Sequence, residues 1–425
     1  MKIAIVGTGI AGNVAAYHLH REHNITVFEA GAHLGGHTHT HDIDIAGRTY
    51  AVDTGFIVFN DWTYPNFIRL LDEIDVPSQK SNMSFSVRVD HRNLEYNGTS
   101  LNSLFAQRSN LLRPSFYRMI REILRFNREA LALLDGANDT LTLGGYLQRQ
   151  GYSQVFINHY LVPMGAAIWS TDPQSMLEFP AHYLVRFFHN HGMMSVDQRP
   201  TWRVIRGGSR EYVKRLTASF RHRIRLNTPV TAIRRLPSHV EIETKDSPPQ
   251  RFDAVFIAAH SDQALHLLVD PSPLEHEVLG AIPYQENDVV LHTDTRLLPK
   301  RKLAWAAWNY HVPQQPEERV AVTYNMNILQ GLDAPVTFCV TLNRTADIDP
   351  NKIIKRLTYH HPLFTRAGVA AQQRQGEVNG ANRTFFCGAY WRFGFHEDGV
   401  VSALHALEHF KEWTQYAQLP LRRVG

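Results

Sequence analysis

The sequence predicts an α/β fold in which a domain built on a parallel sheet is interrupted by a mixed α+β lobe. Three observations predict this architecture. A glycine-rich turn joins an apolar strand to a helix near the amino end, and a carboxylate ends a second strand about 20 residues later. A further apolar strand, far along the chain at 251–259, can return to the same sheet.

The first predicted element is an apolar strand at 3–6, which runs into the turn GTGIAG at 7–12 and then a helix. Gly7 permits the tight turn, Gly9 lets a diphosphate approach the backbone, and Gly12 lets helix and strand pack closely. The phosphates would then lie at a helix amino terminus. A second strand at 25–28 ends at Glu29, whose carboxylate can accept hydrogen bonds from a ribose. The predicted dinucleotide site comprises Gly7, Gly9, Ile10, Ala11, Gly12, Glu29 and Ala30.

The stretch EAGAHLGGHTHTHD at 29–42 contains four histidines, at 33, 37, 39 and 41. The first two are spaced as in a helical metal pair, but the two glycines between them disfavour a helix. The last three could share one face of a strand, yet no Cys or Glu partner stands at a metal-site spacing. We therefore predict no metal. We expect Gly35 and Gly36 to bring backbone close to a second phosphate or ribityl group, with His37 reaching the cofactor.

Two segments resemble a known superfamily. Glu29 followed by LGGH at 34–37 resembles the second signature of the flavin-containing amine oxidases and phytoene desaturases, in which Gly-Gly-Arg follows the ribose-binding Glu. His37 stands here in place of that Arg. The segment VDTGF at 52–56 resembles the next family segment, whose backbone runs beside the flavin ring; this adds Thr54, Gly55 and Phe56 to the site. The resemblance implies a Rossmann-like FAD-binding domain of the amine oxidase type. We expect the FAD to be non-covalent, because no flavin-linking Cys or His motif is evident.

Later segments are similar to the strands with which this superfamily returns to its first domain. RGG at 206–208 opens a predicted helix through 220, and strands follow at 224–226, 230–236, 240–243 and 251–259. The resemblance implies that Val230 contacts the adenine through its backbone.

A strand at 384–387 reaches Gly388, and a helix is predicted to begin around Asp398. The amino terminus of such a helix would stabilise negative charge on a reduced flavin ring. An ordinary terminal helix capped by Asp398 is the alternative. The predicted flavin contacts here are Gly388, Glu397, Asp398 and Val400.

The remaining segments match no nucleotide signature. We predict an FAD-binding domain formed by 1–78, 200–282 and 376–425, and a substrate domain formed by 79–199 and 283–375. No internal repeat or low-complexity linker separates them, so we expect the two lobes to pack as one body.

The composition of the chain limits the binding partners and the cellular compartment that we expect. The 425 residues include 44 basic and 40 acidic ones, so a nucleic acid is not an expected partner. Cys339 and Cys387 lie outside any CxxC, which argues against a disulfide framework or a thiolate metal site. No secretory signal follows Met1, and no window reaches the roughly 18 apolar residues of a spanning helix. We expect a cytoplasmic protein.

Residues 105–134 combine apolar residues at helical spacing with six arginines, and they predict a basic amphipathic helix. Such a helix could make a peripheral contact with the inner face of an anionic membrane. A solvated arginine face over an ordinary core stripe is the alternative. The arginines are Arg108, Arg113, Arg118, Arg121, Arg125 and Arg128.

A second resemblance covers nearly the whole chain. The stretches LHTD at 291–294, YHHP at 359–362, FCGAY at 386–390 and GFHEDG at 394–399 are similar to the flavin domain that precedes the methyltransferase in plant cyclopropane fatty acid synthases, and to its stand-alone bacterial relatives. This resemblance implies that the substrate is the acyl chain of a lipid. It further implies desaturation of a methylated chain on the route to furan fatty acids, and a methyltransferase partner.

Three functions therefore stay open. The first is hydride removal from a C–H bond of a lipid acyl chain or another apolar small molecule, the second is oxidation of a small amine, and the third is an FAD-holding, lipid-binding partner of a methyltransferase. His292 lies where amine oxidases of the superfamily carry a Lys near the flavin. His292, Tyr310 and His396 are the predicted proton carriers. An aromatic strand at 303–310 could wall an apolar tunnel or belong to the core.

Overall fold

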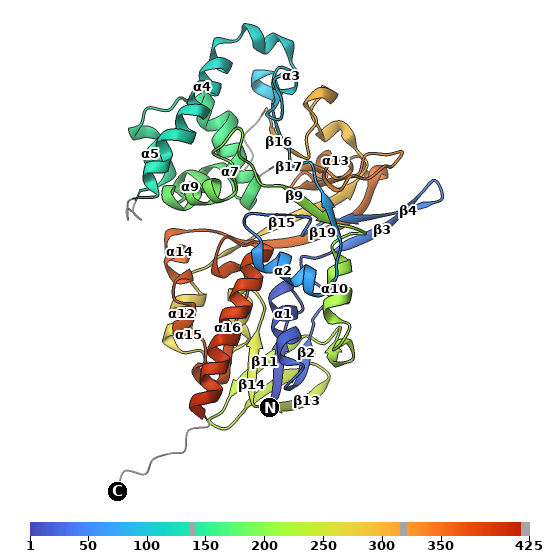
Figure 1. Cartoon of the computed structure of the whole chain (residues 1–425), viewed down its shortest axis with the longest axis vertical. Coiled ribbons are helices and arrows are strands. Elements are labelled where there is room, and N and C mark those ends of the chain that lie inside the picture. The colour runs from blue at the N-terminus through green and yellow to red at the C-terminus, as the bar shows by residue number, and fades with distance from the viewer. Residues whose placement is uncertain (136–140, 315–320, 418–425) are drawn as a thin grey trace.

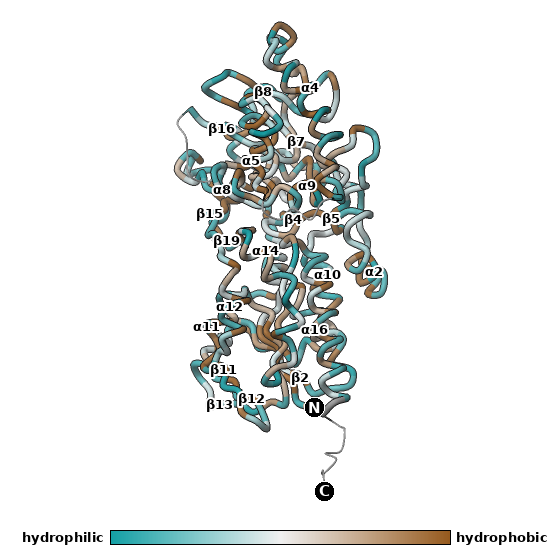
Figure 2. The backbone as a smooth tube through the Cα atoms, turned by 90° about the vertical axis from the view of Figure 1, so that its left-hand side faces the viewer, coloured by the Kyte–Doolittle hydropathy of each residue, from teal (hydrophilic) through white to brown (hydrophobic). Residues whose placement is uncertain are grey.

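The computed structural model describes residues 1–135, 141–314 and 321–417. Two lobes follow one another along the long axis (Figure 1). One lobe contains the amino terminus and a five-stranded sheet, and the other contains a seven-stranded sheet with helices stacked over it. Figure 2 shows apolar segments in the interior of both lobes.

The five-stranded sheet is parallel throughout, with the order β10-β2-β1-β14-β20. Its strands are β1 (Lys2–Val6), β2 (Asn24–Phe28), β10 (Ile224–Arg225), β14 (Ala254–Ile257) and β20 (Thr384–Phe386). Side chains alternate between the two faces of this sheet. Ile3 and Ile5 pack into one core, whereas Ala4 and Val6 pack into another on the opposite face.

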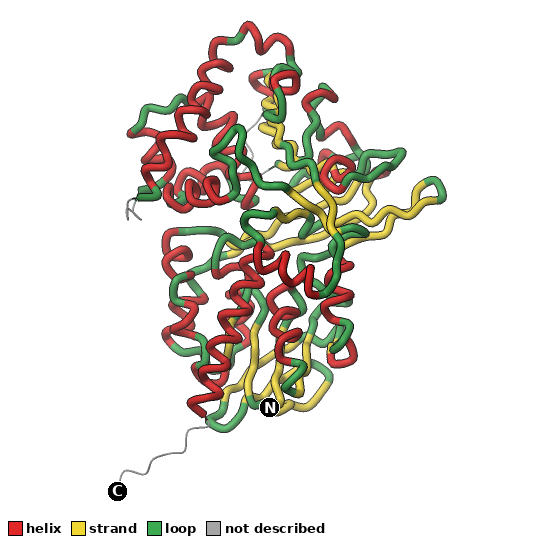
Figure 3. Tube along the Cα trace, in the orientation of Figure 1, coloured by secondary structure: helices red, strands yellow, loops and turns green. Residues whose placement is uncertain are grey.

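Helices cover one face of this sheet, and a smaller sheet with further helices covers the other (Figure 3). The first layer consists of α1 (Ile10–Leu19), α2 (Pro65–Glu73), α10 (Arg210–Thr217) and α16 (His396–Ala417). The second consists of β11 (Val230–Arg235), β12 (Val240–Thr244), β13 (Ser247–Phe252), α11 (Ser261–Leu267), α12 (Pro273–Leu279), α14 (Arg366–Gln372) and α15 (Gln375–Val378). The parallel sheet is thus buried on both faces, as parallel sheets generally are.

The single strand predicted at 251–259 is wrong, because the structure divides it at Asp253. Residues up to Phe252 belong to β13, which pairs antiparallel with β12, and β14 begins at Ala254 beside β1. The Asp253 carboxylate accepts the Lys2 amide at 2.7 Å, and its own amide donates to the Lys2 carbonyl at 2.7 Å. These two bonds anchor the corner at which the chain changes sheets.

The second lobe is organised by the mixed sheet β19-β15-β18-β17-β16-β7-β8, in which only β16 and β7 are parallel. Its strands are β7 (Phe85–Val89), β8 (Leu94–Asn97), β15 (Tyr284–His292), β16 (Trp308–Val312), β17 (Val322–Asn325), β18 (Cys339–Leu342) and β19 (Ile353–Pro362). The helices of this lobe are α3 (Leu101–Leu104), α4 (Pro114–Glu129), α5 (Leu143–Arg149), α6 (Gln154–Phe156), α7 (Val162–Trp169), α8 (Pro173–Glu178), α9 (Ala181–Asn190) and α13 (Met326–Gln330).

Short strands occupy the region where the chain passes between the lobes (Figure 1). They form the hairpin β3 (Thr40–Ile45) with β4 (Arg48–Asp53), and the small sheet β5 (Val58–Asn60), β9 (Trp202–Ile205) and β6 (Ser78–Lys80). The parallel sheet draws its strands from 1–78, 200–282 and 376–425, and the seven-stranded sheet draws its strands from 79–199 and 283–375.

Two predicted elements of the substrate lobe differ in extent. The helix predicted at 105–134 is regular only in α4, because Pro114 forces Arg113 out of helical geometry and a 3-10 turn precedes it. The strand predicted at 303–310 starts only at Trp308, after a 3-10 turn at Lys302–Ala304. None of the helices in the described ranges is both long and apolar enough to cross a bilayer.

Candidate active site

A cavity of about 920 Å³ lies between the two lobes. Its wall is formed by the carboxyl ends of β1, β2 and β14, by β15 and β19 of the seven-stranded sheet, and by the end of α7. Ligands of open parallel sheets bind outside the carboxyl ends of their strands. The wall includes the predicted residues Gly7, Gly9, Ile10, Ala11, Glu29, Ala30, Gly35, Gly36, His37, Thr54, Gly55, Phe56, Val230, Gly388 and His396.

The glycine turn forms one end of the cavity. Gly7 has a φ of +100°, which a residue with a side chain rarely adopts. A Cβ at Gly12 would come within 2.1 Å of the Gly7 carbonyl oxygen, so Gly12 packs in the turn instead of lining the cavity. A Cβ at Gly9 would meet no other atom within 4 Å. The space above Gly9, at the amino terminus of α1, therefore fits a diphosphate.

Glu29 is held in place by two backbone amides and one hydroxyl. One of its oxygens accepts the Thr8 amide at 2.9 Å and the Thr8 hydroxyl at 2.5 Å, and the other accepts the Gly31 amide at 2.8 Å. These bonds fix the carboxylate at the end of β2, beside Ala30 and Val230 on the cavity wall. A ribose hydroxyl can donate to its remaining lone pairs, as the sequence motif predicts.

The Gly35-Gly36 turn brings the next segment against the glycine turn. Gly35 and Gly36 have φ angles of +117° and +59°, and a Cβ at Gly36 would lie 3.2 Å from the Gly9 Cα. His37 follows directly and stacks on Tyr359, with ring centroids 5.0 Å apart. Burial, followed by the neighbouring imidazoles of His260 and His360, lowers the pKa of His37 to about 4.

Thr54, Gly55 and Phe56 run alongside this turn. The Phe56 amide donates to the His37 carbonyl at 2.8 Å, and a Cβ at Gly55 would lie 2.0 Å from the same oxygen. The Phe56 ring stacks on His396 with a centroid distance of 3.5 Å. This close packing fixes the strap that the sequence predicts beside the flavin ring.

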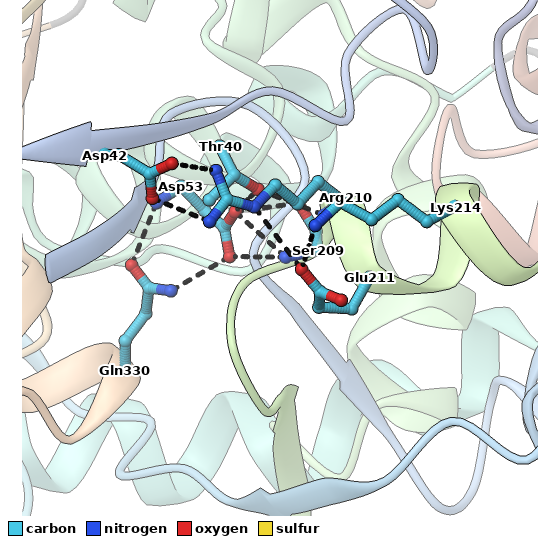
Figure 4. Close-up of polar contacts among 8 residues, drawn as sticks. All are labelled: Thr40, Asp42, Asp53, Ser209, Arg210, Glu211, Lys214 and Gln330. Carbon is cyan, nitrogen blue, oxygen red and sulfur yellow. Dashed lines mark hydrogen bonds and ion pairs between the residues drawn. The ribbon is translucent and has the colours of Figure 1, made fainter. Parts of the chain in front are cut away.

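A buried carboxylate, Asp53, anchors the start of the strap (Figure 4). It accepts the Thr40 hydroxyl at 2.5 Å, the Ser209 amide at 3.0 Å and the Gln330 side-chain amide at 2.9 Å. Ser209 is the N-cap residue of α10, and Gln330 lies at the end of α13 in the other lobe. Asp53 therefore ties the cofactor strap to both lobes. No sequence motif marked it beyond its place in VDTGF.

Helix α16 begins at His396, two residues before the predicted start. The Gly399 amide already donates to the Phe395 carbonyl at 3.1 Å, so the free amides of the first turn are those of 396–398. The side chains of Glu397 and Asp398 are bonded to backbone amides of the protein. Glu397 accepts the Asn66 and Phe67 amides at 3.1 and 2.9 Å, and Asp398 accepts the Phe395 amide at 2.9 Å.

The predicted contacts of Glu397, Asp398 and Val400 are therefore corrected. None of the three lines the cavity, and Val400 packs in the core under the parallel sheet. What this helix terminus offers is the free main-chain amides of its first turn, 396–398.

Two of the three predicted proton carriers lie away from the cavity. His292 is fully buried, its Nε2 lies 2.7 Å from the Thr341 hydroxyl, and its Nδ1 accepts the Asp294 amide at 3.0 Å. Tyr310 lies on β16 and is buried in the core that this strand forms with β7 and α4. Neither residue lines the cavity, so their predicted role is wrong. Both side chains project from faces of their strands that pack against protein.

His396 does line the cavity, but its ring is already bonded. Its Nε2 lies 3.0 Å from the Thr38 hydroxyl and 2.9 Å from the Tyr212 hydroxyl. Burial holds the pKa of His396 well below its usual range, so the ring is neutral at pH 7. This arrangement makes His396 a positioning group for Phe56, and its use as a proton carrier stays a prediction.

Four aromatic or imidazole residues of the cavity wall were missed as site residues. His260 follows β14, Tyr359, His360 and His361 end β19, and all four reach the cavity together with His37. His260 stacks on Tyr284 at 4.5 Å. Only the pairing of β15 with β19 brings these residues to the end of the parallel sheet, and no local spacing signals it.

The other histidines of 29–42 pack among themselves. His39 stacks on His33 at 3.9 Å and lies 4.1 Å from His41, between ring centroids. Within 1–135, 141–314 and 321–417, no group of three or more His, Cys, Asp or Glu side chains is arranged to hold a metal ion.

The residues around the cavity fit the three parts of FAD: the diphosphate, the ribose and the flavin ring. In this arrangement the open space above Gly9 would hold the diphosphate, Glu29 would accept bonds from the ribose, and the Phe56 strap would lie beside the flavin ring. When bound, FAD would supply the hydride acceptor of an oxidoreductase.

Comparisons with known proteins agree with this geometry. A family described as flavin containing amine oxidoreductase matches residues 10–327. A CLA-producing fatty acid isomerase from P. acnes is similar over 96% of this chain and 98% of its own, with a TM-score of 0.70 and 17% identity. Cyclohexylamine oxidase from Brevibacterium oxydans is similar over 97% and 99%, with a TM-score of 0.69 and 15% identity.

A putative protoporphyrinogen oxidase from Exiguobacterium has a TM-score of 0.67 and 17% identity, over 97% of this chain and 99% of its own. At these identities the three structures show the shared fold. The family match covers most of the chain and carries the assignment: the protein belongs to the flavin-containing amine oxidoreductase family and is an FAD-dependent oxidoreductase.

Proposed function

We propose that the protein removes a hydride from a C–H bond of a lipid acyl chain. The observation that carries this proposal is the character of the cavity in the substrate lobe. Its wall there is formed by aliphatic and aromatic side chains from β5 and the residue before it, from α7, α13 and the seven-stranded sheet, and from the loop after β19. They are Ile57, Val58, Ile168, Val289, Trp308, Tyr324, Leu329, Leu342 and Phe364. Burying an apolar chain against such a wall is favourable, because apolar surface on both sides is removed from water.

The charged side chains of the cavity lie elsewhere. Among the described residues that line it, the only carboxylates are Glu29, at the ribose position, and Asp262, on the surface of α11. An alkylammonium substrate would meet no counter-ion beside the apolar wall, and burying an unpaired charge is costly. This feature favours an acyl chain over an amine.

A buried donor supports a substrate that carries an oxygen. Trp308 lines the cavity, and its indole Nε1 is buried without a hydrogen-bond partner among the described residues. Buried donors almost always have a partner. A carboxylate or ester oxygen of the substrate can accept this hydrogen bond, whereas an ammonium group cannot.

Anaerobic reduction of the flavin tests the proposal. We expect a methyl-branched fatty acid or its phospholipid to bleach the flavin absorbance, and cyclohexylamine to leave it unchanged. Ile168→Trp should slow bleaching at least roughly tenfold by filling the apolar end, whereas the volume-conserving Ile168→Leu should not. Bleaching by the amine alone would contradict the acyl-chain proposal. Bleaching by neither class would favour the lipid-binding partner of a methyltransferase.

We further propose that the enzyme reaches its lipid at the inner face of an anionic membrane through α4. This helix lies at the end of the substrate lobe opposite the amino terminus (Figure 1). Tyr117, Arg121, Leu124, Arg128 and Leu131 recur at intervals of four and three residues and are all exposed, so they form one outward stripe. Leu112, just before the helix, is 88% exposed. Exposed leucines beside arginines suit an anionic lipid surface.

Not every arginine of this region is available. Arg125 donates to Glu129 at 2.7 Å and to the Gln150 carbonyl at 2.8 Å, and Arg118 pairs with Glu122 at 3.2 Å. Arg128 lies at the longer distance of 3.5 Å from Glu129, and its side chain is 79% exposed. Arg121 and Arg128 are therefore the better probes of a membrane contact.

Co-sedimentation with liposomes tests this contact. The double variant Arg121→Gln and Arg128→Gln should bind vesicles of anionic phospholipid roughly 30-fold more weakly at low salt, at about 1 kcal/mol per arginine. Leu112→Ser with Leu124→Ser should weaken binding to neutral vesicles as well. A matched pair on other faces, Arg221→Gln with Arg366→Gln, should behave as the parent. A parent that ignores anionic vesicles at low salt would contradict the membrane proposal.

A further inference from the structure

The FAD cavity lacks permanent positive charge. No Lys or Arg is found among its described lining residues, and its two carboxylates are Glu29 and Asp262. The diphosphate of FAD adds two negative charges. Histidines are the only side chains of the wall that can become cationic, and they are His37, His260, His266, His360, His361 and His396.

Four of these histidines form a cluster beside the glycine turn, named here the imidazole cluster: His37, His260, His360 and His361. The His37 ring lies 6.1 Å from that of His260 and 5.6 Å from that of His361, and His260 lies 6.2 Å from His360, all between ring centroids. These residues come from the Gly35-Gly36 turn, the end of β14 and the end of β19.

The cluster is adjacent to the position predicted for the diphosphate. Gly36, directly before His37, packs against Gly9, and Ala258, two residues before His260, packs against Gly7. The Nε2 of His37 is buried without a hydrogen-bond partner among the described residues. A buried orphan nitrogen beside a diphosphate position points to a bond with a ligand.

We propose that the imidazole cluster is the diphosphate clamp of this enzyme, and that FAD binding takes up about one proton, held mainly by His37. The inference rests on FAD as the cofactor and is independent of the acyl-chain proposal. It assigns to three further residues, His260, His360 and His361, a role in cofactor binding.

Three rings of the cluster, those of His37, His260 and His361, are uncharged in the free protein at pH 7. Burial first, and the neighbouring imidazoles second, lower the pKa of His37 and of His260 to about 4 and the pKa of His361 to about 3. A diphosphate next to these rings favours their charged form. The first imidazolium then disfavours a second one about 6 Å away, which limits the uptake to roughly one proton.

The other charged groups near the cluster are already engaged or peripheral. Glu286 lies 3.6 Å from His360 on the exposed side of β19, and Glu29 is bound by Thr8 and Gly31. Asp262 is exposed on α11, and the phenols of Tyr284 and Tyr359 stack on His260 and His37. Raised pKa values keep both phenols neutral, Tyr359 at about 12. None of these groups supplies a cation to the diphosphate.

Titration calorimetry of the FAD-free protein counts the protons. At pH 7, the apparent binding enthalpy of FAD measured in phosphate and in Tris should differ by the amount that corresponds to an uptake of about one proton. The Kd should rise with pH between 6 and 8, by up to about tenfold per unit, because the bound state holds more protons than the free state. ADP-ribose, which carries the diphosphate without the flavin, should show the same uptake.

Two variants assign the proton. His37→Gln should bind FAD about 10- to 100-fold more weakly at pH 6 and lose most of the uptake. His37→Arg carries a permanent charge and should bind FAD without uptake and with a flat pH profile. His276→Gln, which replaces an exposed histidine on α12, is the control and should match the parent.

The outcomes separate the clamp from the cofactor. FAD binding with no proton uptake and a Kd constant from pH 6 to 8 would overturn the clamp and leave the flavin enzyme standing. Full uptake in His37→Arg would also overturn it. A protein that binds no FAD at any pH would contradict the cofactor itself, and the clamp with it.

Discussion

Replacing Gly9 with valine is expected to remove FAD from the protein while leaving the fold in place. A Cβ at Gly9 meets no protein atom within 4 Å, and the φ of −62° is ordinary for any residue. The valine methyl groups would instead occupy the diphosphate space at the amino terminus of α1. The combined loss of charged hydrogen bonds and steric fit should weaken FAD binding by about 3 kcal/mol or more, roughly 100-fold.

The absorbance of the purified protein near the flavin maximum, together with calorimetric FAD titration, measures this loss. Thermal unfolding of the FAD-free forms should give similar midpoints for parent and Gly9→Val. The matched contrast is Gly12→Val, whose Cβ would lie 2.1 Å from the Gly7 carbonyl oxygen and should therefore disrupt the fold itself. A Gly9→Val protein that retains a full complement of FAD would sink the diphosphate assignment.

Removing the buried carboxylate of Asp53 should have the second large effect. In Asp53→Ala, the Ser209 amide, the Thr40 hydroxyl and the Gln330 amide lose their common acceptor inside the protein. Buried donors without partners are costly, so we expect the free energy of unfolding to fall by about 3–5 kcal/mol. FAD affinity should fall as well, because the 54–56 strap loses its anchor to both lobes.

Chemical denaturation of the FAD-free protein measures the stability change. Asp42→Ala is the control: Asp42 pairs with Arg210 in the same region (Figure 4) but is exposed, so its loss should cost only about 0–1 kcal/mol. Equal effects of the two substitutions would contradict the anchoring role of Asp53.

The contribution of Asp53 to the free energy of unfolding should depend on pH in a direction that its pKa determines. Burial raises the pKa of Asp53 to about 6, above the roughly 3.9 of an unfolded chain. The folded protein therefore binds the proton of the Asp53 carboxyl group more tightly than the unfolded chain does. The stability that protonated Asp53 contributes is fully present below about pH 4 and is lost as pH rises through about 6. Relative to Asp53→Asn, the parent should gain stability as pH is lowered from 7 to 5.

Local patterns predicted the nucleotide half of the site because its determinants lie within a few residues of one another. The glycine turn at 7–12 and the Gly35-Gly36 turn each impose a backbone conformation that only glycine adopts readily, and Glu29 follows its strand directly. Such signals survive in a single sequence, and the residues they mark line the cavity, apart from Gly12, which packs in the turn.

The prediction of catalytic residues depended on which face of a strand each residue occupies. His292 was predicted beside the flavin by its place in a strand, but Val289, three residues earlier, lines the cavity from the other face. Successive residues of a strand point to opposite faces, so an error of one position exchanges cavity for core. His292 consequently bonds to Thr341 on the neighbouring strand β18.

The sequence by itself determined the α/β architecture, the FAD-binding turns and the carboxylate of Glu29, since each rests on backbone geometry or short spacing. Only the tertiary structure decided that His260, from the end of β14, meets His360 and His361, from the end of β19, at the turn that carries His37. The pairing of β15 with β19 across about 70 residues creates that meeting. Long-range strand pairing leaves no local periodicity, so the imidazole cluster emerges only when the two lobes close on one another.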